Sequence, residues 1–501
     1  MRRHLATVAV LALLAGACGG AGPSQVPTPA ASATPVATAA PPPADPLGPR
    51  PELKTPEPFT PPVPTSWQRP NGMIVWLLER HTLPVVAMQV VIPGAGSAGD
   101  APDKGGLALT TANMLDEGAG TRGPLDIARD IDRLGATLAT GAYTEYAFAQ
   151  LTSLKKNLAP AAAILGDVLG KPKFSPVEWK RVHDLWENDL RARQSEPNAV
   201  AGVVSARQLF GSDPYGHPVN GTLKSAAKVS LDDVKTFYAQ WWHPEAATVV
   251  VAGDITRAEL DPLLDKAFAG WQPARTKKPP AAPTKSPSAS AEAGRRVVVV
   301  DRPDAPQSVI SVVRLGVAAS SPEAPPLVRV NAALGGSFTS RLNQDLREEH
   351  GWSYGARSRF SFTRRPGMFA AEAAVHTEHT GEALKAMLVD IEELAKGGLT
   401  KEEVEKTRLL ARGELVESFE AVEAAARRLA RNAGVGLGPD HEAKASALLY
   451  GATKADLDKL AAEHIDVKNG IVVIVGPRAK LEPQLKAIGI TKIEASGPEG
   501  D

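Results

Sequence analysis

Three positions on one predicted helix have the spacing of a metal-binding motif. The run from Leu107 to Leu115 contains no glycine or proline and carries apolar residues on one side, which predicts a helix. Positions 109, 112 and 113 then share one helical face. In an H-x-x-E-H motif, two histidines one turn apart hold zinc, and the glutamate between them takes a proton from the metal-bound water. Here the positions carry Leu109, Ala112 and Asn113, so the frame is present and its chemistry is missing.

The histidines offer one alternative metal site. His376 and His379 are three residues apart with Glu378 between them, a spacing that could hold a metal on a helix. The threonines and the glycine around them favour a turn between a strand and a helix instead. A self-sufficient enzyme with a metal relocated to His376 and His379 is therefore the least favoured hypothesis. Other histidines have the sequence context of surface or loop residues: His183 with Glu187, His217 and His243.

The residues around the first helix resemble a known family. Gly106-Leu107-Ala108 precedes the three positions, Met114-Leu115 follows them, and Gly120-Thr121 comes next. This run is similar to the metal helix of the pitrilysin/insulinase family of zinc metallopeptidases, which includes the mitochondrial processing peptidase. The resemblance implies a third ligand position on a long helix further along the chain. Counting back from Pro197 assigns that position to Asp189. One carboxylate and one amide do not hold zinc, so we expect no metal or other cofactor in this chain.

A second run, from Gly335 to Tyr354, matches the same family more specifically. It contains a Gly-Gly turn, then Ser-Arg-Leu at 340–342, then Arg347 near a predicted helix end and Tyr354 seven residues later. In active members the equivalent pair comes from the domain opposite the zinc and binds the substrate near the scissile carbonyl. A guanidinium and a phenol are donors suited to a peptide carbonyl or an oxyanion. In the structural alternative, Arg341 and Arg347 form helix-surface ion pairs with Asp345 and Glu348, and Tyr354 lies in a strand core.

Two further runs resemble the family. One is the loop from Asp213 to Thr222, with its Pro-Tyr-Gly and Gly-Thr steps, and the other extends from Phe237 to Asp254. The resemblance therefore spans about residues 67–490, nearly all of the sequence that we expect to fold.

Signals for strands and helices occur twice in the same order. In the first set we predict strands at 73–78, 85–92, within 135–154 and at 247–254, with helices at 107–115, 124–134, 158–170 and 176–194. In the second set we predict strands at 297–300, 308–315, 368–375 and 470–475, with helices at 327–333, 340–349, 381–395 and 400–430. A Ser/Thr-x-x-Glu capping box, starting at Ser175 and at Thr400, opens a long helix in each set.

This repetition predicts an α+β protein of two homologous domains, at 66–275 and 296–495. We expect each domain to be an antiparallel sheet with helices on one face. A Pro- and Ser-rich linker at 276–295 joins them. The family resemblance implies the same pair of domains in a clamshell arrangement.

The N-terminus has the pattern of an exported lipoprotein. Basic residues at positions 2 and 3 precede an apolar run from Leu5 to Leu14, which is too short to span a bilayer. Small residues then lead to Cys18, the only cysteine in the chain. We expect residues 1–18 to be a signal peptide and Cys18 to carry the lipid. The alternative is an ordinary cleaved secretion signal with a chance cysteine.

The residues after Cys18 indicate where the protein resides. Gly19, rather than an aspartate, predicts an outer-membrane lipoprotein that faces the periplasm. Residues 19–65 are rich in proline and alanine, which predicts a disordered tether. The chain has 56 basic and 56 acidic residues, so we expect no nucleic-acid partner.

These observations lead to a functional hypothesis. In some family members one chain holds H-x-x-E-H, and a second chain lacks the metal ligands and keeps the Arg/Tyr pair. The sequence resembles the second kind. We expect a non-catalytic, substrate-binding subunit that supplies Arg347 and Tyr354 to the zinc site of a homologous partner for peptide hydrolysis. The alternative is a non-enzymatic binding or scaffold protein, like the related core subunits of the respiratory cytochrome complex.

Overall fold

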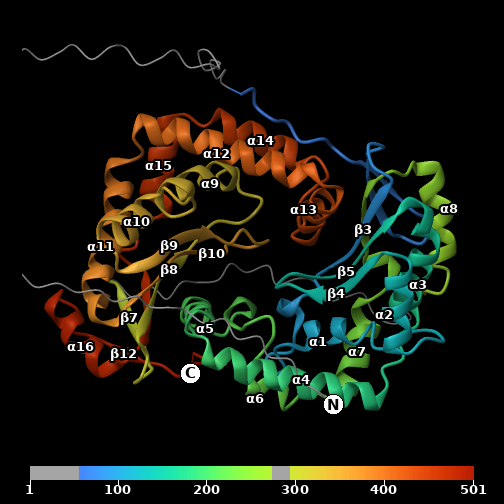
Figure 1. Cartoon of the computed structure of the whole chain (residues 1–501), viewed down its shortest axis with the longest axis horizontal. Coiled ribbons are helices and arrows are strands. Elements are labelled where there is room, and N and C mark those ends of the chain that lie inside the picture. Colours follow the sequence, from blue (N-terminus) through green and yellow to red (C-terminus); the bar gives the residue numbers. More distant parts are fainter. Residues whose placement is uncertain (1–55, 273–293, 501) are drawn as a thin grey trace, which may run out of the picture. The chain divides into compact units, whose positions relative to one another are not determined.

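The computed structural model describes residues 56–272 and 294–500. These belong to one compact unit that begins at Pro56 (Figure 1). We call residues 56–272 the first half and residues 294–500 the second half. The expected signal peptide, Cys18, most of the expected tether and nearly all of the expected linker lie outside the described residues.

Each half contains a six-stranded sheet within the described residues, and five strands of one sheet have the same order as five of the other. The first sheet has the order β1-β2-β6-β3-β5-β4, and the second has β12-β7-β11-β8-β10-β9. The first set of strands is β1 (Thr65–Gln68), β2 (Ile74–Glu79), β3 (Val85–Pro93), β4 (Thr137–Ala142), β5 (Tyr146–Leu154) and β6 (Thr248–Gly253). The second set is β7 (Arg296–Asp301), β8 (Gln307–Leu315), β9 (Ser353–Phe360), β10 (Met368–His376), β11 (Ile471–Gly476) and β12 (Glu494–Ala495). This shared order confirms the expected duplication of an α+β unit.

The sheets are mixed, which corrects the expectation of purely antiparallel sheets. The closing strand of each half inserts between the first two strands of the shared core, which run in opposite directions. It must therefore be parallel to one neighbour and antiparallel to the other. Accordingly, β6 is parallel to β2 and antiparallel to β3, while β11 is parallel to β7 and antiparallel to β8.

The helices surround these sheets. Those of the first half are α1 (Leu107–Asn113), α2 (Pro124–Arg133), α3 (Leu158–Gly170), α4 (Pro176–Ser195), α5 (Pro197–Phe210), α6 (Leu223–Ala226), α7 (Leu231–Trp241) and α8 (Arg257–Ala267). Those of the second half are α9 (Ala324–Leu334), α10 (Arg341–Asn343), α11 (Thr380–Gly397), α12 (Lys401–Glu420), α13 (Val422–Gly434), α14 (His441–Gly451), α15 (Lys454–His464) and α16 (Arg478–Ala487). No helix in the described part of the chain is long and apolar enough to cross a membrane.

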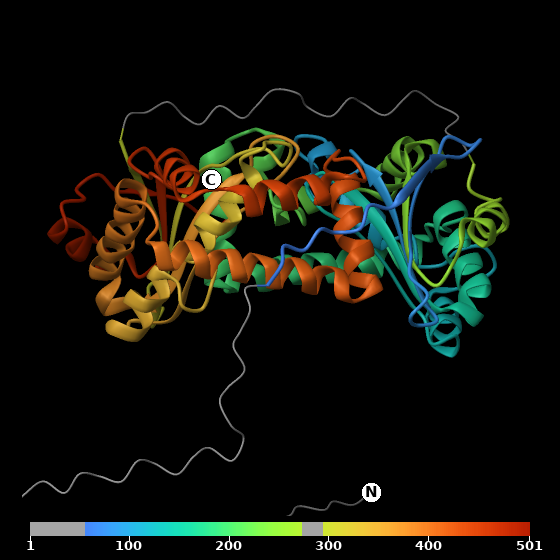
Figure 2. The ribbon, with the colours of Figure 1, turned by 90° about the horizontal axis from the view of Figure 1, so that it is seen from above.

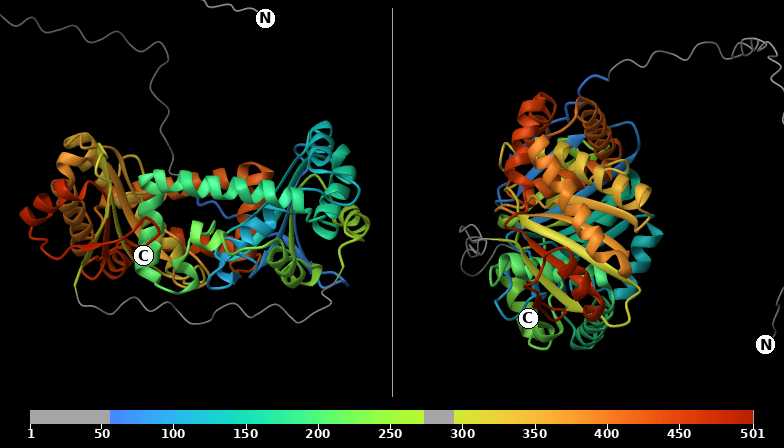
Figure 3. Two further views of the ribbon diagram at one scale, coloured as in Figure 1. Left: turned by 90° about the horizontal axis from the view of Figure 1, so that it is seen from below. Right: turned by 90° about the vertical axis from the view of Figure 1, so that its left-hand side faces the viewer.

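The halves exchange helices, so both faces of each sheet are covered. Side chains alternate along the strands, and in the first sheet Val75 and Leu77 face the main core of the first half while Trp76 and Leu78 face a second core. That second core is completed by α12 and α13 of the second half. Reciprocally, α5 of the first half packs on β8 and β11. Figure 3 shows α4 leading toward the second half, and Figure 2 shows α12 leading toward the first. The expectation of helices on one face is therefore incomplete.

Two local predictions also need correction. The predicted helix at 400–430 is broken at Ala421, whose extended backbone ends α12 and lets α13 turn onto the first sheet. The capping box of Thr400 is confirmed, since its hydroxyl accepts from the backbone N–H of Glu403. At α4 the helix begins after Ser175 as predicted, but the Ser175 side chain makes no cap hydrogen bond. Glu178 pairs with Arg181 there instead.

Candidate functional site

Helix α1 positions the three residues of the empty metal motif. Asp100 caps the start of the helix by accepting hydrogen bonds from the backbone N–H groups of Gly106 and Ala108, each at 2.7 Å. Burial raises the pKa of the Asp100 carboxyl to about 8. Gly106 has φ +96°, and a Cβ there would lie 2.5 Å from the ring of Trp186 on α4. Helices α1 and α4 therefore meet at a glycine that no larger residue could replace without displacement.

The side chains at this contact do not fit zinc. Leu109 packs against the core of the first half, Ala112 is fully buried, and Asn113 is exposed. Asp189 on α4 is also exposed. A catalytic zinc site needs three protein ligands, and this group offers one carboxylate and one neutral amide. The positions that the sequence assigned to the motif thus lie on adjacent helices without the donor set of a metal site.

The histidines that the sequence singled out make structural contacts. His243 is buried and its Nε2 lies 3.0 Å from the carbonyl oxygen of Gln240. Burial lowers the pKa of His217, and His183 lies 3.1 Å from the carbonyl oxygen of Ala226. His376 ends β10, and His379 follows in a short 3₁₀ turn, where its Nδ1 lies 2.9 Å from Glu382. The predicted turn between strand and helix is confirmed.

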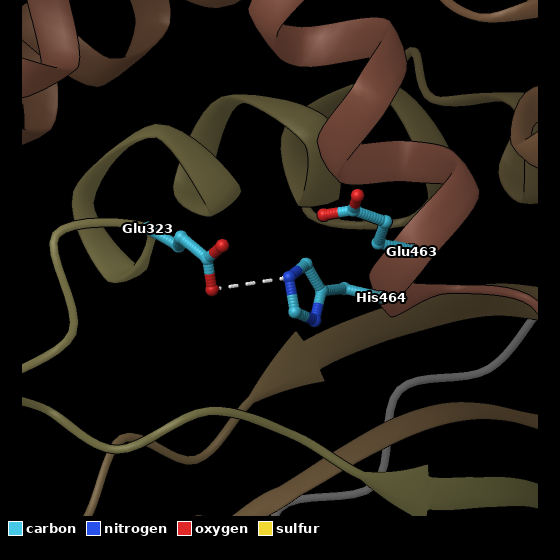
Figure 4. Close-up of side chains that lie close together, drawn as sticks. All are labelled: Glu323, Glu463 and His464. Carbon is cyan, nitrogen blue, oxygen red and sulfur yellow. Dashed lines mark ion pairs between the residues drawn. The ribbon is translucent and has the colours of Figure 1, made fainter.

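One group within the described residues does place three potential metal ligands together. Glu323, Glu463 and His464 have ligand atoms within 4.8 Å of one another (Figure 4). His464 Nε2 lies 3.2 Å from Glu323, an ion pair that ties α15 to the start of α9. Glu463 is exposed, and the positive charge of Arg314 nearby opposes a bound cation. Burial lowers the pKa of His464, so we interpret the group as a local polar contact between α15 and the start of α9.

Arg347 lies in a π-helical turn, Gln344–Glu349, which continues α10. Its guanidinium carbon lies 4.5 Å from the ring centroid of Phe338, and Phe338 is 66% exposed. Its Nε is 3.6 Å from Glu348, a surface contact worth little by itself. The guanidinium therefore rests on an aromatic ring and keeps donors available to solvent.

The same turn is anchored by a different arginine. Arg341 makes a two-point ion pair with Glu403 at 2.8 and 2.7 Å, which fixes α10 against the start of α12 and corrects the alternative that paired it with Asp345. His350 stacks on Trp352 with ring centroids 3.9 Å apart, and Trp352 also stacks on His379. These contacts hold both ends of the segment that carries Arg347.

Tyr354 is 85% exposed near the start of β9, the edge strand of the second sheet. The alternative that placed it in a strand core is wrong, because its neighbours Ser353 and Ala356 take the buried positions. The phenol hydroxyl is available to a ligand. The guanidinium of Arg347 and the phenol of Tyr354 are thus both accessible to solvent.

A polar cluster at the contact between the halves was not predicted from the sequence. Arg365, in the loop between β9 and β10, makes two hydrogen bonds to Asp213 of the first half at 2.8 and 2.7 Å, and its guanidinium lies over the ring of Tyr215. The Tyr215 hydroxyl donates to Glu145. Burial raises the pKa of Glu145, and burial and the Glu145 charge raise the pKa of Tyr215 to about 12. Two adjacent arginines before Pro366 were the only sequence signal of this cluster.

A partly buried carboxyl next to the Arg347 turn gives the first testable prediction. Burial, with the charges of Asp345 and Glu393, raises the pKa of Asp390 to about 7. The folded protein therefore binds this proton more tightly than the unfolded chain, so stability falls as pH rises from about 4 to about 7. Asp390→Asn should remove that slope and stabilise the protein at pH 8 by about 1–2 kcal/mol, a figure reduced for partial solvent screening. Urea unfolding at several pH values measures it. Asp304→Asn, at an exposed site, is the matched control, and equal slopes in both variants would contradict the prediction.

Comparisons with known proteins identify the family of the chain. The model of the insulinase family, peptidase family M16, matches residues 75–222, and the model of the M16 inactive domain matches residues 228–410. The chain belongs to the insulinase family, M16. The resemblance stated from the sequence is confirmed. The two models together cover the empty metal helix, α4, Arg347 and Tyr354.

Similar M16 proteins include both named proteases and a named non-peptidase. The chain is 23% identical to an uncharacterized zinc protease YmxG of Bacillus subtilis over 72% of this chain and 86% of the relative. It is 24% identical to a non-peptidase homolog YmxG of Helicobacter pylori over 66% of this chain and 74% of the relative. An M16 inactive-domain structure from Pseudomonas fluorescens has a TM-score of 0.76 at 24% identity, covering 83% of this chain and 98% of that one. The inactive-domain description and the non-peptidase name fit a non-catalytic M16 member, whereas the zinc protease name does not distinguish an active from an inactive one.

Proposed function

We propose that this M16 chain is the non-catalytic, substrate-binding subunit of a heteromeric zinc peptidase. The observation that carries the proposal is a contrast within one chain. The metal helix α1 presents Leu109, Ala112 and Asn113, whereas the second half presents Arg347 and Tyr354 to solvent. In an M16 domain without metal ligands, an accessible guanidinium and phenol can bind substrate at a zinc site that a homologous chain supplies.

The two exposed donors suit a peptide carbonyl in a partner's zinc site. Phe338 restricts the guanidinium plane of Arg347, so less side-chain freedom is lost when it binds. The Tyr354 hydroxyl adds one donor at a separate point. Donors that are positioned in advance stabilise charge on a carbonyl oxygen as it develops. This chain would bind and orient peptides, while the partner's metal would polarise the scissile carbonyl.

The partner in this proposal is a zinc-bearing M16 homologue with H-x-x-E-H. We further propose that the chain is exported and anchored to the outer membrane, facing the periplasm, through a lipid on Cys18. The support is the sequence pattern that ends at Cys18. A tethered subunit would hold the peptidase at that membrane.

Co-purification tests the partner. The full chain, tagged at the C-terminus and extracted from native membranes in mild detergent, should bring down an M16 homologue with H-x-x-E-H. Radiolabelled palmitate should be incorporated into this chain and not into a Cys18→Ser variant. Isolation with other proteins and no M16 homologue would instead support the scaffold, the alternative that the non-peptidase relative of Helicobacter pylori favours.

A further inference from the structure

A cleft between the two halves combines aromatic and basic walls. It has a volume of about 620 Å³ and is open to solvent. The first half contributes the β4–β5 turn, with Tyr143 and Tyr146, and the second half contributes the end of β9 and one side of α13. Phe360 and Phe362 stack with ring centroids 5.8 Å apart on the second-half side. Such surfaces bind extended chains that carry apolar side chains.

The charge of the cleft is positive. Three arginines of α13 line it, against a single glutamate, Glu145. Arg428 is neutralised by Glu442 at 2.8 Å, and both oxygens of Glu145 already accept hydrogen bonds, from Tyr215 and from the backbone N–H of Arg364. The other two arginines, Arg427 and Arg431, are exposed on one helical face at i and i+4.

Arg427 and Arg431 are available to a ligand. Neither has an ion pair with any carboxylate of the described residues, and Arg431 makes only a long hydrogen bond, 3.4 Å, to the carbonyl oxygen of Phe362. Two guanidinium groups without an ion pair, facing a cleft whose one glutamate already accepts two hydrogen bonds, match a ligand with carboxylates. Their placement beside four aromatic rings matches apolar or aromatic neighbours of those carboxylates.

We propose that this cleft binds acidic side chains of the peptide substrate, in sequences that alternate acidic with aromatic or large apolar residues. The inference rests on the proposed function, because it takes peptides as the ligand, and it deepens that function by naming their charge. Tyr354 and Phe360 lie six residues apart along β9, about 20 Å for a strand. A substrate held at both places would therefore carry its acidic residues about six residues from the bond near Tyr354.

Direct binding to the isolated full-length mature chain tests the inference without any peptidase activity. Isothermal titration would compare an amidated peptide of alternating phenylalanine and glutamate with its counterpart that has lysine in place of glutamate. The glutamate peptide should bind about tenfold more tightly at low salt, the size expected for two solvent-exposed ion pairs and removal of repulsion. A C-terminal carboxylate should add little, since the proposed ligands are side chains.

Charge reversal locates the site. Arg427→Glu with Arg431→Glu should remove the preference for the glutamate peptide. Lys385→Glu with Lys486→Glu makes the same change of net charge on α11 and α16, outside the cleft, and should leave the preference intact. If charge reversal prevents folding, the milder pair Arg427→Gln and Arg431→Gln serves instead. It should lower the preference for the glutamate peptide about threefold to tenfold.

Several outcomes would overturn the inference: equal affinity for the two peptides, an unchanged preference in the cleft variants, or tighter binding of a single-stranded oligonucleotide than of the glutamate peptide. These results are distinct from failure of the proposed function. A lone chain that selects acidic peptides but gains no activity from a zinc-bearing homologue would retain the inference and lose the partnership. An active pair that does not discriminate between the two peptides would retain the partnership and contradict the inference.

Discussion

Arg347→Ala combined with Tyr354→Phe should lower the kcat/KM of the assembled peptidase by about 10²–10³-fold, the loss typical when donors to a developing oxyanion are removed. The expectation follows from two accessible side chains: Arg347, which is partly exposed and rests on Phe338, and Tyr354, which is 85% exposed on β9. Because the donors act on the substrate and not on the fold, thermal stability of the variant should match that of the parent. Steady-state kinetics with a fluorogenic peptide and the zinc-bearing partner measures the effect.

A matched pair of substitutions separates this effect from general damage. Arg478→Ala with Tyr450→Phe removes one guanidinium and one phenol hydroxyl on α16 and α14, two helices that carry neither Arg347 nor Tyr354, and should leave kcat/KM within about twofold. Unchanged activity in the Arg347/Tyr354 variant, with the partner still bound, would assign the pair a structural role and favour the scaffold.

Arg365→Ala should destabilise the protein by about 2–3 kcal/mol, the largest stability effect that we expect from one substitution in a loop, because the Arg365 side chain is buried between the halves. The substitution leaves the Asp213 carboxylate without its two-point partner and removes the stacking on Tyr215. The figure lies below the ~3–5 kcal/mol typical of fully buried pairs because the Asp213 side chain keeps 20% of its surface exposed. Urea unfolding measures the loss.

The pair also has a defined pH dependence. Burial opposes the charge of Asp213, but the hydrogen bonds from Arg365 and from the backbone N–H of Tyr215 outweigh it, and the pKa of Asp213 is lowered. Its contribution is therefore present above the pKa of the unfolded chain, 3.8, and is lost as pH falls through the folded value.

Two controls sharpen the Arg365 experiment. Arg357→Ala removes a mostly exposed arginine from the neighbouring strand and should cost less than about 1 kcal/mol. The double variant Asp213→Ala, Arg365→Ala should lose less free energy of unfolding than the two single variants lose together, since it leaves no buried charge unpaired. Strictly additive losses would show that the two side chains do not act as a pair.

The periodic parts of the chain were predictable because their patterns are local. The apolar runs of β2, β3 and β11 and the long helices α3, α4 and α11 follow the strand and helix periods, and the structure places them close to the predicted bounds. The empty metal frame was likewise visible in three residue types at helical spacing. The exposure of Tyr354 could not be predicted from the sequence, since a tyrosine in a strand fits either a core or a surface position.

Features that depend on the exchange of helices could not be predicted locally. Helix α5 was not predicted. The break at Ala421 was predicted as continuous helix, because alanine has the highest helix propensity and only the packing of α13 on the first sheet selects the turn. The Arg365 cluster and the unpaired Arg427 and Arg431 arise where segments from both halves meet. Their role depends on contacts that link residues more than 150 positions apart, for which one sequence carries no signal.

Zinc content and peptidase activity of the purified chain, measured alone and then after mixing with a zinc-bearing M16 homologue, test the central claim most directly. We expect no bound zinc and no hydrolysis by the lone chain, and peptide hydrolysis that appears on mixing and is abolished by a chelator. Stoichiometric zinc and chelator-sensitive hydrolysis in the lone chain would contradict it, because Leu109, Ala112 and Asn113 could not then mark the absence of a metal site.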